Sequence, residues 1–598
     1  MRMPKFEPVG IKSICWTQAL ALLAGTGLPK AQVMGPGVPN LTYTQGELFK
    51  SIHDFHPVSV QDRNNKKGMN HVAMHKGYLF AIYGEDSGVP GGGISFYDIS
   101  NPRSVKLVHA QDENDLRESH GFGFHSRGGK DYAAMQSGRG IQFWDFTDVR
   151  APKKLIDFRV PGVEFSDYDH GNWWTMWQAP YVFIGRGLDG FSVIDARNPA
   201  APTQLQITVD GARQGSFPTS KMGNFPIGPV FAIGNLLVLT SRGTGYNPGV
   251  SVVDIGDPTA PKLLGTSKDV SGYSSFVNGN KVFWAGTDRH NGKAVIQDFS
   301  DPENIKVIGV SPQAGGRGEY ISVQDEFIHM GVEDKYAKID FSNPSAMRIV
   351  DNSFIGPGRA QEGFAIPIGN LVMVTDDHSE GSSLLPHQTA PDTRPPVPNM
   401  ASPKDGAVRQ PLTSRIGFTF TDQIDVQSIT EESFIVRPEG GQPLKGFYSS
   451  QINIVNFTPD SLFKANTTYE VVLVKGGIKD YAGNSLDRDY IYRFSTGNTL
   501  STSIAGSQSI LRPGKLDVKV EGRHVHFRTA ATGLPSEARL VLSDMQGRPK
   551  REFPVAQAGE GMLWKGDDAG GQRLPSGFYI AWVQSRDRIL AHRTFLLP

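Results

Sequence analysis

Five residues that can bind a metal ion occupy similar places in the first 400 residues of the chain. Each stands at or just before a short apolar stretch: His71 in NHVAM, His120 in SHGFGFH, His170 in DYDHGNWW, Glu319 in GEYISV and Glu362 in QEGFAI. Imidazole and carboxylate groups together suit zinc, copper, iron or manganese. Three histidines that leave one coordination position open can also activate a metal-bound water. If the five side chains converge, the sequence predicts a transition-metal site and a metal-dependent oxidoreductase or hydrolase.

A second interpretation of the same five residues needs no metal. Polar side chains at a solvated edge can bind water and the ends of neighbouring strands without a catalytic role. The chain has no GxSxG, HExxH or P-loop motif in a usable context, so the sequence assigns no catalytic residue. We favour this interpretation, in which the region binds a ligand without transforming it.

The elements that would position these residues belong to a repeated phrase. GGISFYDISNPRSVKLV from Gly92 and PGVSVVDIGDPTAPKLLG from Pro248 are two of its six copies. Each copy predicts an apolar strand, a turn in which an aspartate binds backbone amides before a proline, and a second short strand. Another strand pair precedes each phrase, as in NHVAMHKGYLFAIYG, which makes about four strands per unit, the content of a propeller blade. The aligned aspartates are Asp98, Asp145, Asp195, Asp254, Asp298 and Asp340.

The phrase resembles the LVIVD repeat of bacterial surface β-propellers. Glu362 to Gly381 supplies two further inner strands, and Leu41 to Val60 precedes the first unit without inner strands. Joining these two segments would close a ring and leave no exposed edge. The fold class is therefore predicted as all-β, with a seven-bladed β-propeller over residues 41–390. Innermost propeller strands begin around a central channel, and there the five candidate ligands would meet.

Two smaller β-sandwiches are predicted after the propeller. Residues 391–498 contain RIGFTFT, SFIVRP, NIVNFTP, TYEVVLV and YIYRFSTG and a tight turn, IKDYAGNSL. They resemble the bacterial Ig-like module of S-layer and other surface proteins, which implies a spacer or a protein-contact surface. We interpret the acidic residues Asp480 and Asp487 as turn caps, with calcium binding as the alternative.

A polar linker, residues 499–514, leads to the last predicted sandwich at residues 515–598. The string W-x-G-x-D at Trp564 and the phrase LPSGFY resemble the C-terminal sorting domains of type IX secretion substrates and the related flagellar hook-cap Ig-like domain. In the sorting family this module directs passage across the outer membrane, which would make the secretion machinery a partner. A further spacer is the alternative.

The first residues predict export. A basic start and the apolar stretch SICWTQALALLAGTG are typical of a signal peptide, here placed at residues 1–31. The only cysteine, Cys15, lies inside it, so the mature chain is expected to have no disulfide and no thiolate ligand. Lysine plus arginine and aspartate plus glutamate balance at 60 each, which argues against a nucleic-acid partner. No later stretch predicts a transmembrane helix.

These patterns together predict an extracytoplasmic protein, secreted or attached to the outer surface. Its propeller would bind a surface protein or a glycan, and its two sandwiches would act as spacer and as sorting or anchoring device. The alternative is an enzyme with a transition metal at His71, His120, His170, Glu319 and Glu362. A purely structural coat component is a third interpretation, which depends only on the Ig-like module.

Overall fold

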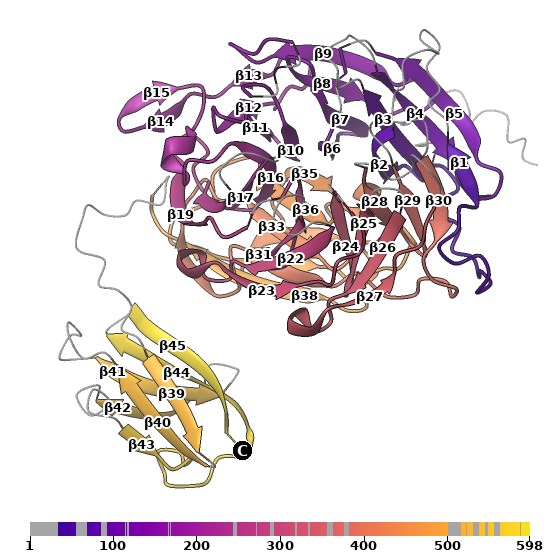
Figure 1. The fold of residues 1–598 in the computed structure, drawn as a ribbon. Helices are drawn as coiled ribbons and strands as arrows, with labels where there is room; N and C mark the ends of the chain where they lie inside the picture. Colours follow the sequence, from indigo (N-terminus) through magenta and orange to yellow (C-terminus); the bar gives the residue numbers. More distant parts are fainter. Residues whose placement is uncertain are drawn as a thin grey trace, which may run out of the picture. The chain divides into compact units, whose positions relative to one another are not determined.

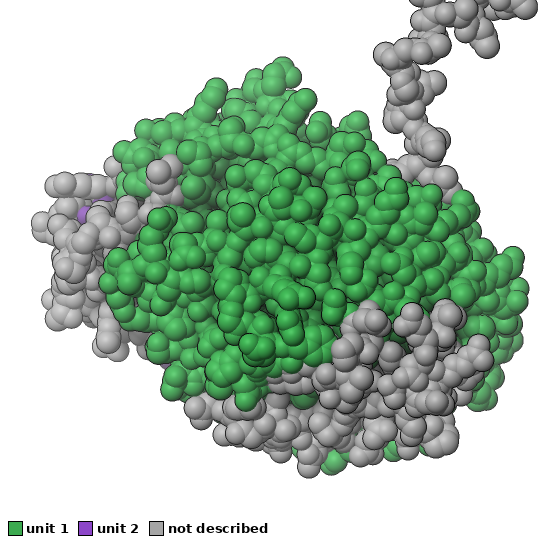
Figure 2. Space-filling view, turned by 90° about the horizontal axis from the view of Figure 1, so that it is seen from above, with its two compact units in different colours: residues 1–502 green, residues 503–598 purple. Residues whose placement is uncertain are grey.

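The computed structural model divides into two compact units, residues 1–502 and residues 503–598 (Figures 1 and 2). In the first unit it describes residues 34–55, 69–84, 92–242, 248–286, 292–355, 363–375 and 382–499, except 114, 117–118, 166, 168, 271, 317, 319 and 333–334. In the second it describes residues 516–597, except 522, 530–537, 545–547, 555–561 and 586–587. The predicted signal peptide, Glu319, Glu362 and nearly all of the predicted linker lie outside these residues. The described chain is all-β, with strands and four short 3-10 helices, and none of these helices could cross a membrane.

Seven groups of four antiparallel strands share one design, and we call them repeat sheets 1 to 7 (Figure 1). Sheet 1 contains β2 (Met69–His75), β3 (Tyr78–Gly84), β4 (Gly92–Asp98) and β5 (Lys106–Asp112). Sheet 2 contains β6 (Phe122–Arg127), β7 (Lys130–Ser137), β8 (Gly140–Asp145) and β9 (Lys153–Arg159). Sheet 3 contains β10 (Trp174–Gln178), β11 (Tyr181–Gly185), β12 (Phe191–Asp195) and β13 (Thr203–Gln204). Sheet 4 contains β16 (Ile227–Ile233), β17 (Leu236–Ser241), β18 (Val250–Asp254) and β19 (Lys262–Ser267).

The remaining repeat sheets have the same order. Sheet 5 contains β20 (Ser275–Asn278), β21 (Lys281–Gly286), β22 (Lys293–Asp298) and β23 (Lys306–Val310). Sheet 6 contains β24 (Ile321–Gln324), β25 (Phe327–Val332), β26 (Lys335–Asp340) and β27 (Arg348–Asp351). Sheet 7 contains β28 (Ala365–Ile368), β29 (Leu371–Val374), β30 (Ser382–Pro386) and β1 (His53–Phe55). Between sheets 3 and 4 the chain forms the hairpin β14 (Ile207–Val209) and β15 (Ala212–Gln214) and the helix η1 (Thr219–Lys221). The helices η2 (Pro302–Asn304) and η3 (Pro344–Ala346) connect the last two strands of sheets 5 and 6.

The recurring aspartate has the same local role in each copy of the repeated phrase. It ends the third strand, and its Oδ1 atom accepts a hydrogen bond from the backbone N–H two residues later, at 2.7–3.0 Å in all six copies. This bond stabilises the turn that reverses the chain into the fourth strand. The predicted function of the aspartate as a turn former is confirmed.

Sheet 7 is completed by the segment that precedes sheet 1 in the chain. β1 pairs with β30 in antiparallel register, with His53 opposite Leu384. At the inner end of this sheet, Thr375 Oγ1 donates a 3.0 Å hydrogen bond to the backbone oxygen of Asn70 in sheet 1. The sequence predicted that these two distant segments join. It did not identify β30, whose residues lack the aspartate-proline phrase of the other copies.

The next domain, residues 391–499, is a β-sandwich, which we call the sandwich module. One layer contains β31 (Pro398–Ser402), β33 (Ile416–Phe420), β36 (Ile454–Pro459) and β35 (Gly446–Gln451). The other contains β32 (Ala407–Gln410), β38 (Tyr490–Thr496), β37 (Thr468–Leu473) and β34 (Phe434–Pro438), and η4 (Val426–Ser428) follows β33 in the chain. The five strands predicted from the sequence are all present.

The sandwich module is docked on the repeat sheets. β35 pairs with β6, with Ser449 opposite His125, so the first layer of the module and sheet 2 form one eight-stranded sheet. Every other repeat sheet contacts the module through the loop between its first two strands. Five of these contacts are hydrogen bonds: Lys76 N to Gln427 Oε1 (2.8 Å), Ala179 N to Ser449 Oγ (3.0 Å), Gly234 N to Asn456 Oδ1 (2.8 Å), Gly279 N to Thr419 Oγ1 (3.0 Å) and Asp325 N to Thr421 O (2.6 Å). In sheet 7 the contact is steric, because a Cβ on Gly369 would lie 3.2 Å from Ala482 Cβ.

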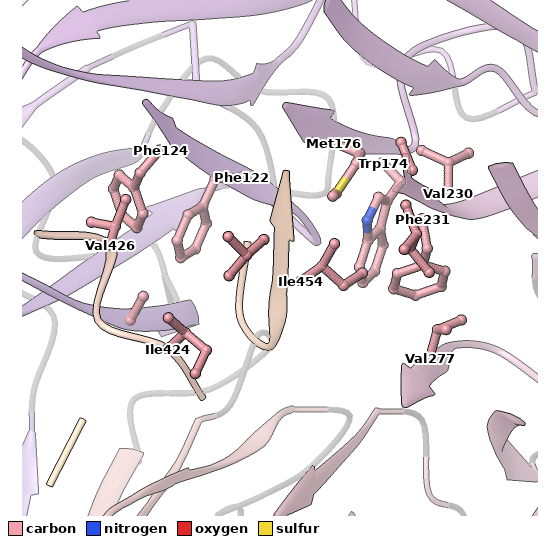
Figure 3. Close-up of a cluster of buried hydrophobic side chains, with 14 of the residues drawn as sticks. Phe122, Phe124, Trp174, Met176, Val230, Phe231, Val277, Ile424, Val426 and Ile454 are labelled. Carbon is pink, nitrogen blue, oxygen red and sulfur yellow. The ribbon is translucent and has the colours of Figure 1, made fainter. Parts of the chain in front are cut away.

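Apolar side chains of the module and of the repeat sheets share one hydrophobic core (Figure 3). Ile424, Val426 and Ile454 come from the module and are at most 3% exposed. They belong to the same cluster as Phe122, Phe124, Trp174, Met176, Val230, Phe231 and Val277 of sheets 2 to 5. Removing such side chains from water is the main favourable contribution to folding. The module is therefore part of the same folded body as the repeat sheets.

The second unit is a separate β-sandwich with its own core. One sheet contains β39 (Leu516–Glu521), β40 (His524–Thr529) and β43 (Met562–Trp564). The other contains β42 (Pro549–Pro554), β41 (Arg539–Asp544), β44 (Gly577–Ser585) and β45 (Arg588–Leu597). Trp564 of the W-x-G-x-D string is 2% exposed and lies in this core, and its indole N–H donates to the backbone oxygen of Asp567 at 2.7 Å.

Replacing Asn456 by alanine should destabilise the docked unit. Its side chain is fully buried; Oδ1 accepts hydrogen bonds from Gly234 N (2.8 Å) and Gln178 Nε2 (2.9 Å), and Nδ2 donates to the Ala232 backbone oxygen (3.0 Å). Asn456→Ala removes the partners of Gly234 N and of the Ala232 oxygen, and Gln178 Nε2 keeps only its bond to the Gly234 oxygen, at 2.9 Å. We expect a loss of roughly 3 kcal/mol, since each unpaired buried group costs about 1–3 kcal/mol.

Urea unfolding of the full chain measures this loss. The matched control is Asn498→Ala, which changes an exposed asparagine of the same module. Equal midpoints for the two variants would show that the bonds to Asn456 do not hold the module in place.

Candidate functional site

The inner strands of six repeat sheets begin next to a layer of stacked rings. One ring comes from each of these sheets: His71, His120, Trp173, Tyr273, Tyr320 and Phe364. The ring centroids are separated by 4.2 Å for His71–Phe364, 4.1 Å for Phe364–Tyr320, 5.4 Å for Tyr320–Tyr273, 5.3 Å for Tyr273–Trp173 and 4.2 Å for Trp173–His120. These separations are in the range of favourable aromatic contacts. We call this set the aromatic layer.

The structure brings together only two of the candidate ligands that it describes. His71 and His120 lie in the aromatic layer and are fully buried. His170 is three residues before Trp173, and its side chain is 48% exposed and forms a 3.1 Å contact between Nδ1 and Asp189 Oδ1. The sequence analysis aligned His170 of sheet 3 with His71 and His120. In the structure the position equivalent to His120 is held by Trp173, three residues later. The two glutamates cannot be compared, because they lie outside the described residues.

His71 has an unusual environment for a polar side chain. Neither Nδ1 nor Nε2 has a hydrogen-bond partner among the described residues, and the ring centre lies 4.2 Å from that of Phe364 and 4.6 Å from that of Phe122. Burial, with a smaller contribution from His120, lowers the pKa of His71 to about 3. His120 differs, because its Nδ1 contacts the backbone oxygen of Trp173 at 3.2 Å. The layer thus holds a neutral imidazole whose nitrogens are both free to bind.

Four members of the aromatic layer were missed by the sequence analysis, which searched these positions for metal ligands. Tyr320 follows Glu319 by one residue, and Phe364 follows Glu362 by two. In the stretch with Tyr273 the sequence analysis found no ligand, and in the stretch with Trp173 it chose His170 instead. An aromatic residue recurs at the start of the strand in NWW, SGYSS, GEYIS and EGFAI, and this was the available signal. A one-residue shift along a strand moves a side chain to the opposite face. An alignment of the first residues of the inner strands therefore selects the wrong side chain if it is wrong by one position.

A cleft of about 800 Å³ opens where the sandwich module meets sheets 2, 3 and 4. Its wall includes Tyr181, Phe447 and the exposed Leu462, and three arginines, Arg127, Arg197 and Arg415. The cleft combines aromatic faces with guanidinium groups, and both repeat sheets and module contribute to it. A ligand there would contact both parts at once.

The three arginines differ in their availability to a ligand. Arg415 is buried and donates to Gln178 Oε1 at 2.5 Å, and burial lowers its pKa to about 10. The guanidinium of Arg127 lies 3.9 Å from the centre of the Phe447 ring and forms a 3.0 Å ion pair with Asp460. The Arg197 side chain is 60% exposed, and its nearest carboxylate, Asp195, is 3.6 Å away. Arg197 is thus the arginine with the most capacity for a bound anion.

His71→Phe should stabilise the protein at neutral pH. Phenylalanine keeps the stacking with Phe364 and Phe122 and removes two buried nitrogens that have no partner, and such a replacement is expected to gain about 1 kcal/mol. The matched variant His120→Phe should instead destabilise, since it leaves the Trp173 backbone oxygen without its contact. Thermal and urea unfolding of both variants beside the wild type measure the difference.

The advantage of His71→Phe should grow in acid. Histidine in the unfolded chain takes up a proton near pH 6.5, whereas folded His71 stays neutral down to about pH 3, so the wild type loses stability as the pH falls. Between pH 7.5 and 5.5 this difference amounts to about 1.4 kcal/mol. A constant difference between the two proteins over this range would contradict a buried, neutral His71.

Comparison with known proteins agrees with the geometry of the sandwich module. No curated protein matches the chain. Sqt1 from Chaetomium thermophilum is 11% identical, with 56% of this chain and 98% of that chain covered and a TM-score of 0.39. The computationally designed protein Ika8 is 10% identical, with 57% and 100% covered and a TM-score of 0.36. Residues 392–496 match the bacterial Ig-like domain family, whose members typically occur in extracellular surface proteins, and the sandwich module is a bacterial Ig-like domain.

Proposed function

We propose that this chain is an exported bacterial surface protein that binds an acidic glycan in the cleft between its repeat sheets and its sandwich module. The seven repeat sheets would form a seven-bladed β-propeller of the LVIVD-repeat type, with residues 1–31 as signal peptide. The observation that carries the proposed binding function is the cleft itself, with an exposed arginine beside aromatic rings.

The chemistry of the cleft favours a sugar that bears a carboxylate. An aromatic face such as that of the partly exposed Tyr181 can pack against the apolar side of a sugar ring. A guanidinium group matches a carboxylate with two parallel hydrogen bonds. Arg197 Nη2 also donates to the Tyr181 hydroxyl at 3.3 Å, which holds the guanidinium beside that ring. The proposed role of the module changes accordingly from a spacer to one wall of the binding site.

The second unit supports the proposed location at the cell surface. Its buried Trp564 and the LPSGFY phrase belong to a compact sandwich that forms a unit of its own. A sorting or anchoring domain has to engage the secretion machinery separately from its cargo. We propose this role for residues 515–598.

Glycan arrays with the purified full chain test the binding function. The wild type is expected to prefer glycans that contain uronic or sialic acids over neutral ones. Arg197→Ala should weaken binding of the acidic glycans roughly tenfold, which corresponds to about 1.4 kcal/mol. Arg159→Ala, which removes an exposed arginine of β9 that does not line the cleft, is the control and should bind like the wild type. Equal binding of neutral and acidic glycans, or an equal loss in both variants, would argue against this site.

The metal-dependent enzyme remains a second candidate because of one observation, the free nitrogens of His71 close to His120. These two imidazoles would hold a transition metal, which would supply Lewis-acid or redox chemistry when bound. Elemental analysis of the wild type beside the double variant His71→Phe/His120→Phe tests this candidate. A stoichiometric metal that is lost from the double variant supports it; no metal in the wild type after incubation with zinc, copper, iron or manganese argues against it.

A further inference from the structure

Three aspartates from separate segments, which we call the acidic triad, meet inside the first unit. Asp392 lies between β30 and β31, Asp422 follows β33, and Asp480 belongs to the turn in IKDYAGNSL. One carboxylate oxygen from each lies within 4.8 Å of the others, and the three residues are 2–3% exposed. No arginine, lysine or histidine forms an ion pair with any of them within the described part of the chain. Three buried carboxylates without a counter-charge are strongly unfavourable unless they hold protons or a cation.

The nearest cation is already engaged elsewhere. Arg394 forms ion pairs with Asp325 Oδ2 at 2.6 Å and with Glu326 Oε2 at 2.8 Å. Its backbone N–H donates to Asp392 Oδ1 at 3.1 Å, and its guanidinium partly offsets the effect of burial, which raises the pKa of Asp392. Asp325 adds a fourth carboxylate nearby, since it raises the pKa of Asp422 together with Asp480 and burial, which is the largest cause. Among the described charged groups around the triad, carboxylates therefore outnumber the one guanidinium, which is already paired with Asp325 and Glu326.

The hydrogen bonds of the triad leave one oxygen unused. Asp480 accepts from the backbone and side-chain amides of Asn484, at 2.9 and 3.0 Å. Asp422 accepts from Gln423 N at 2.6 Å and from Gln324 Nε2 at 3.0 Å. Asp392 Oδ2, on a side chain that is 3% exposed, accepts no hydrogen bond from any residue that the structure describes. An acceptor that is buried and unpaired beside two other carboxylates is the arrangement that a bound cation would satisfy.

We propose that Asp392, Asp422 and Asp480 bind a divalent cation, Ca²⁺, that locks the sandwich module onto the repeat sheets. Calcium is a hard ion that takes oxygen ligands at about 2.3–2.6 Å, so ligands on opposite sides of it stand roughly 4.6–5.2 Å apart. The three oxygens all lie within 4.8 Å of one another, so one such ion can reach all three. The site is independent of the proposed glycan binding and of the aromatic layer.

The position of the triad explains what the cation would stabilise. Asp392 also exchanges hydrogen bonds with Asn40, which lies before β1: its N–H donates to Asn40 Oδ1 at 2.7 Å and its backbone oxygen accepts from Asn40 Nδ2 at 2.5 Å. Gln324, which donates to Asp422, also donates to the backbone oxygen of Gly369 at 3.2 Å. The site therefore joins sheets 6 and 7, the segment that leads to β1, and the module. A cation there would stabilise the contact between sheet 7, which the N-terminal strand β1 completes, and the module.

The test uses the full chain, stripped with a chelator and titrated with CaCl₂ by calorimetry and by thermal unfolding. We expect one Ca²⁺ per chain and an increase of several degrees in the unfolding temperature of the first unit. Terbium is a second probe, since Tyr481 stands next to Asp480 and can sensitise its luminescence. Asp480→Asn and Asp392→Asn should each weaken Ca²⁺ binding more than tenfold. The control Asp487→Asn changes a residue whose carboxylate accepts only from the Tyr490 hydroxyl, and it should bind like the wild type.

The chelated proteins distinguish a lost ligand from a damaged fold. Without Ca²⁺, Asp392→Asn should be at least as stable as the wild type, because it removes one charge from a crowded buried cluster, while Oδ1 keeps the Arg394 N–H and the new amide nitrogen replaces the Oδ2 atom that accepts no hydrogen bond from the described residues. A variant that is stable but no longer responds to Ca²⁺ supports the site. Absence of Ca²⁺ and Tb³⁺ binding by the wild type at millimolar concentration would overturn the proposal, and so would a Ca²⁺ response that persists in both triad variants.

Discussion

The pairing of β35 with β6 determines how the first unit is built. An inner strand that faced an open channel would leave a row of backbone N–H and C=O groups without partners, and such edges are unfavourable when buried. Here the module continues the ladder of sheet 2 across its inner edge. Once that register is set, the loops between the first two strands of the other sheets come to lie under the module. Their backbone groups then need partners, which the amide, hydroxyl and backbone groups of the module supply.

A consequence of this docking is that the centre of the unit is filled. Ile454 and its neighbours pack with Phe122 and Trp174 near one end of the inner strands, and the aromatic layer occupies the positions where those strands begin. Well-packed side chains leave little room for a ligand or for solvent in such a core. Two of the described cavities lie instead along the contact between module and repeat sheets, where surfaces of different shape meet.

The repeat sheets could be predicted because their information is local. Each aspartate binds an amide two residues away, so the phrase can be recognised without knowing the fold. The completion of sheet 7 by β1 followed from counting strands and from the cost of an open edge. The docking could not be predicted, since it depends on pairs that lie far apart in the chain, such as Asn456 with Gly234 and Gln178. Asparagine and glutamine in a strand give no sign that they will be buried, because their burial depends on partners that another domain supplies.

The candidate sites show the same division between local and distant information. His71 and His120 stand out in the sequence because histidine is a common ligand, and the structure does place these two together. The acidic triad was visible only in part: Asp480 was interpreted as a turn cap, and its bonds to Asn484 agree with that role. What the sequence does not reveal is that Asp392 and Asp422 come to the same place from segments 88 and 58 residues away.

A set of similar sheets presents nearly the same surface seven times, so a unique site requires something that breaks the repetition. The sandwich module does this, because it pairs with one sheet and contacts the other six through their loops. Arg415 illustrates the effect: it belongs to the module, donates to Gln178 of sheet 3, and lines the cleft beside Tyr181 of the same sheet. The triad is likewise confined to the one place where sheets 6 and 7 and the module meet. Chemistry particular to this protein is therefore concentrated along this contact, while the repeat sheets provide the rigid surface that holds it.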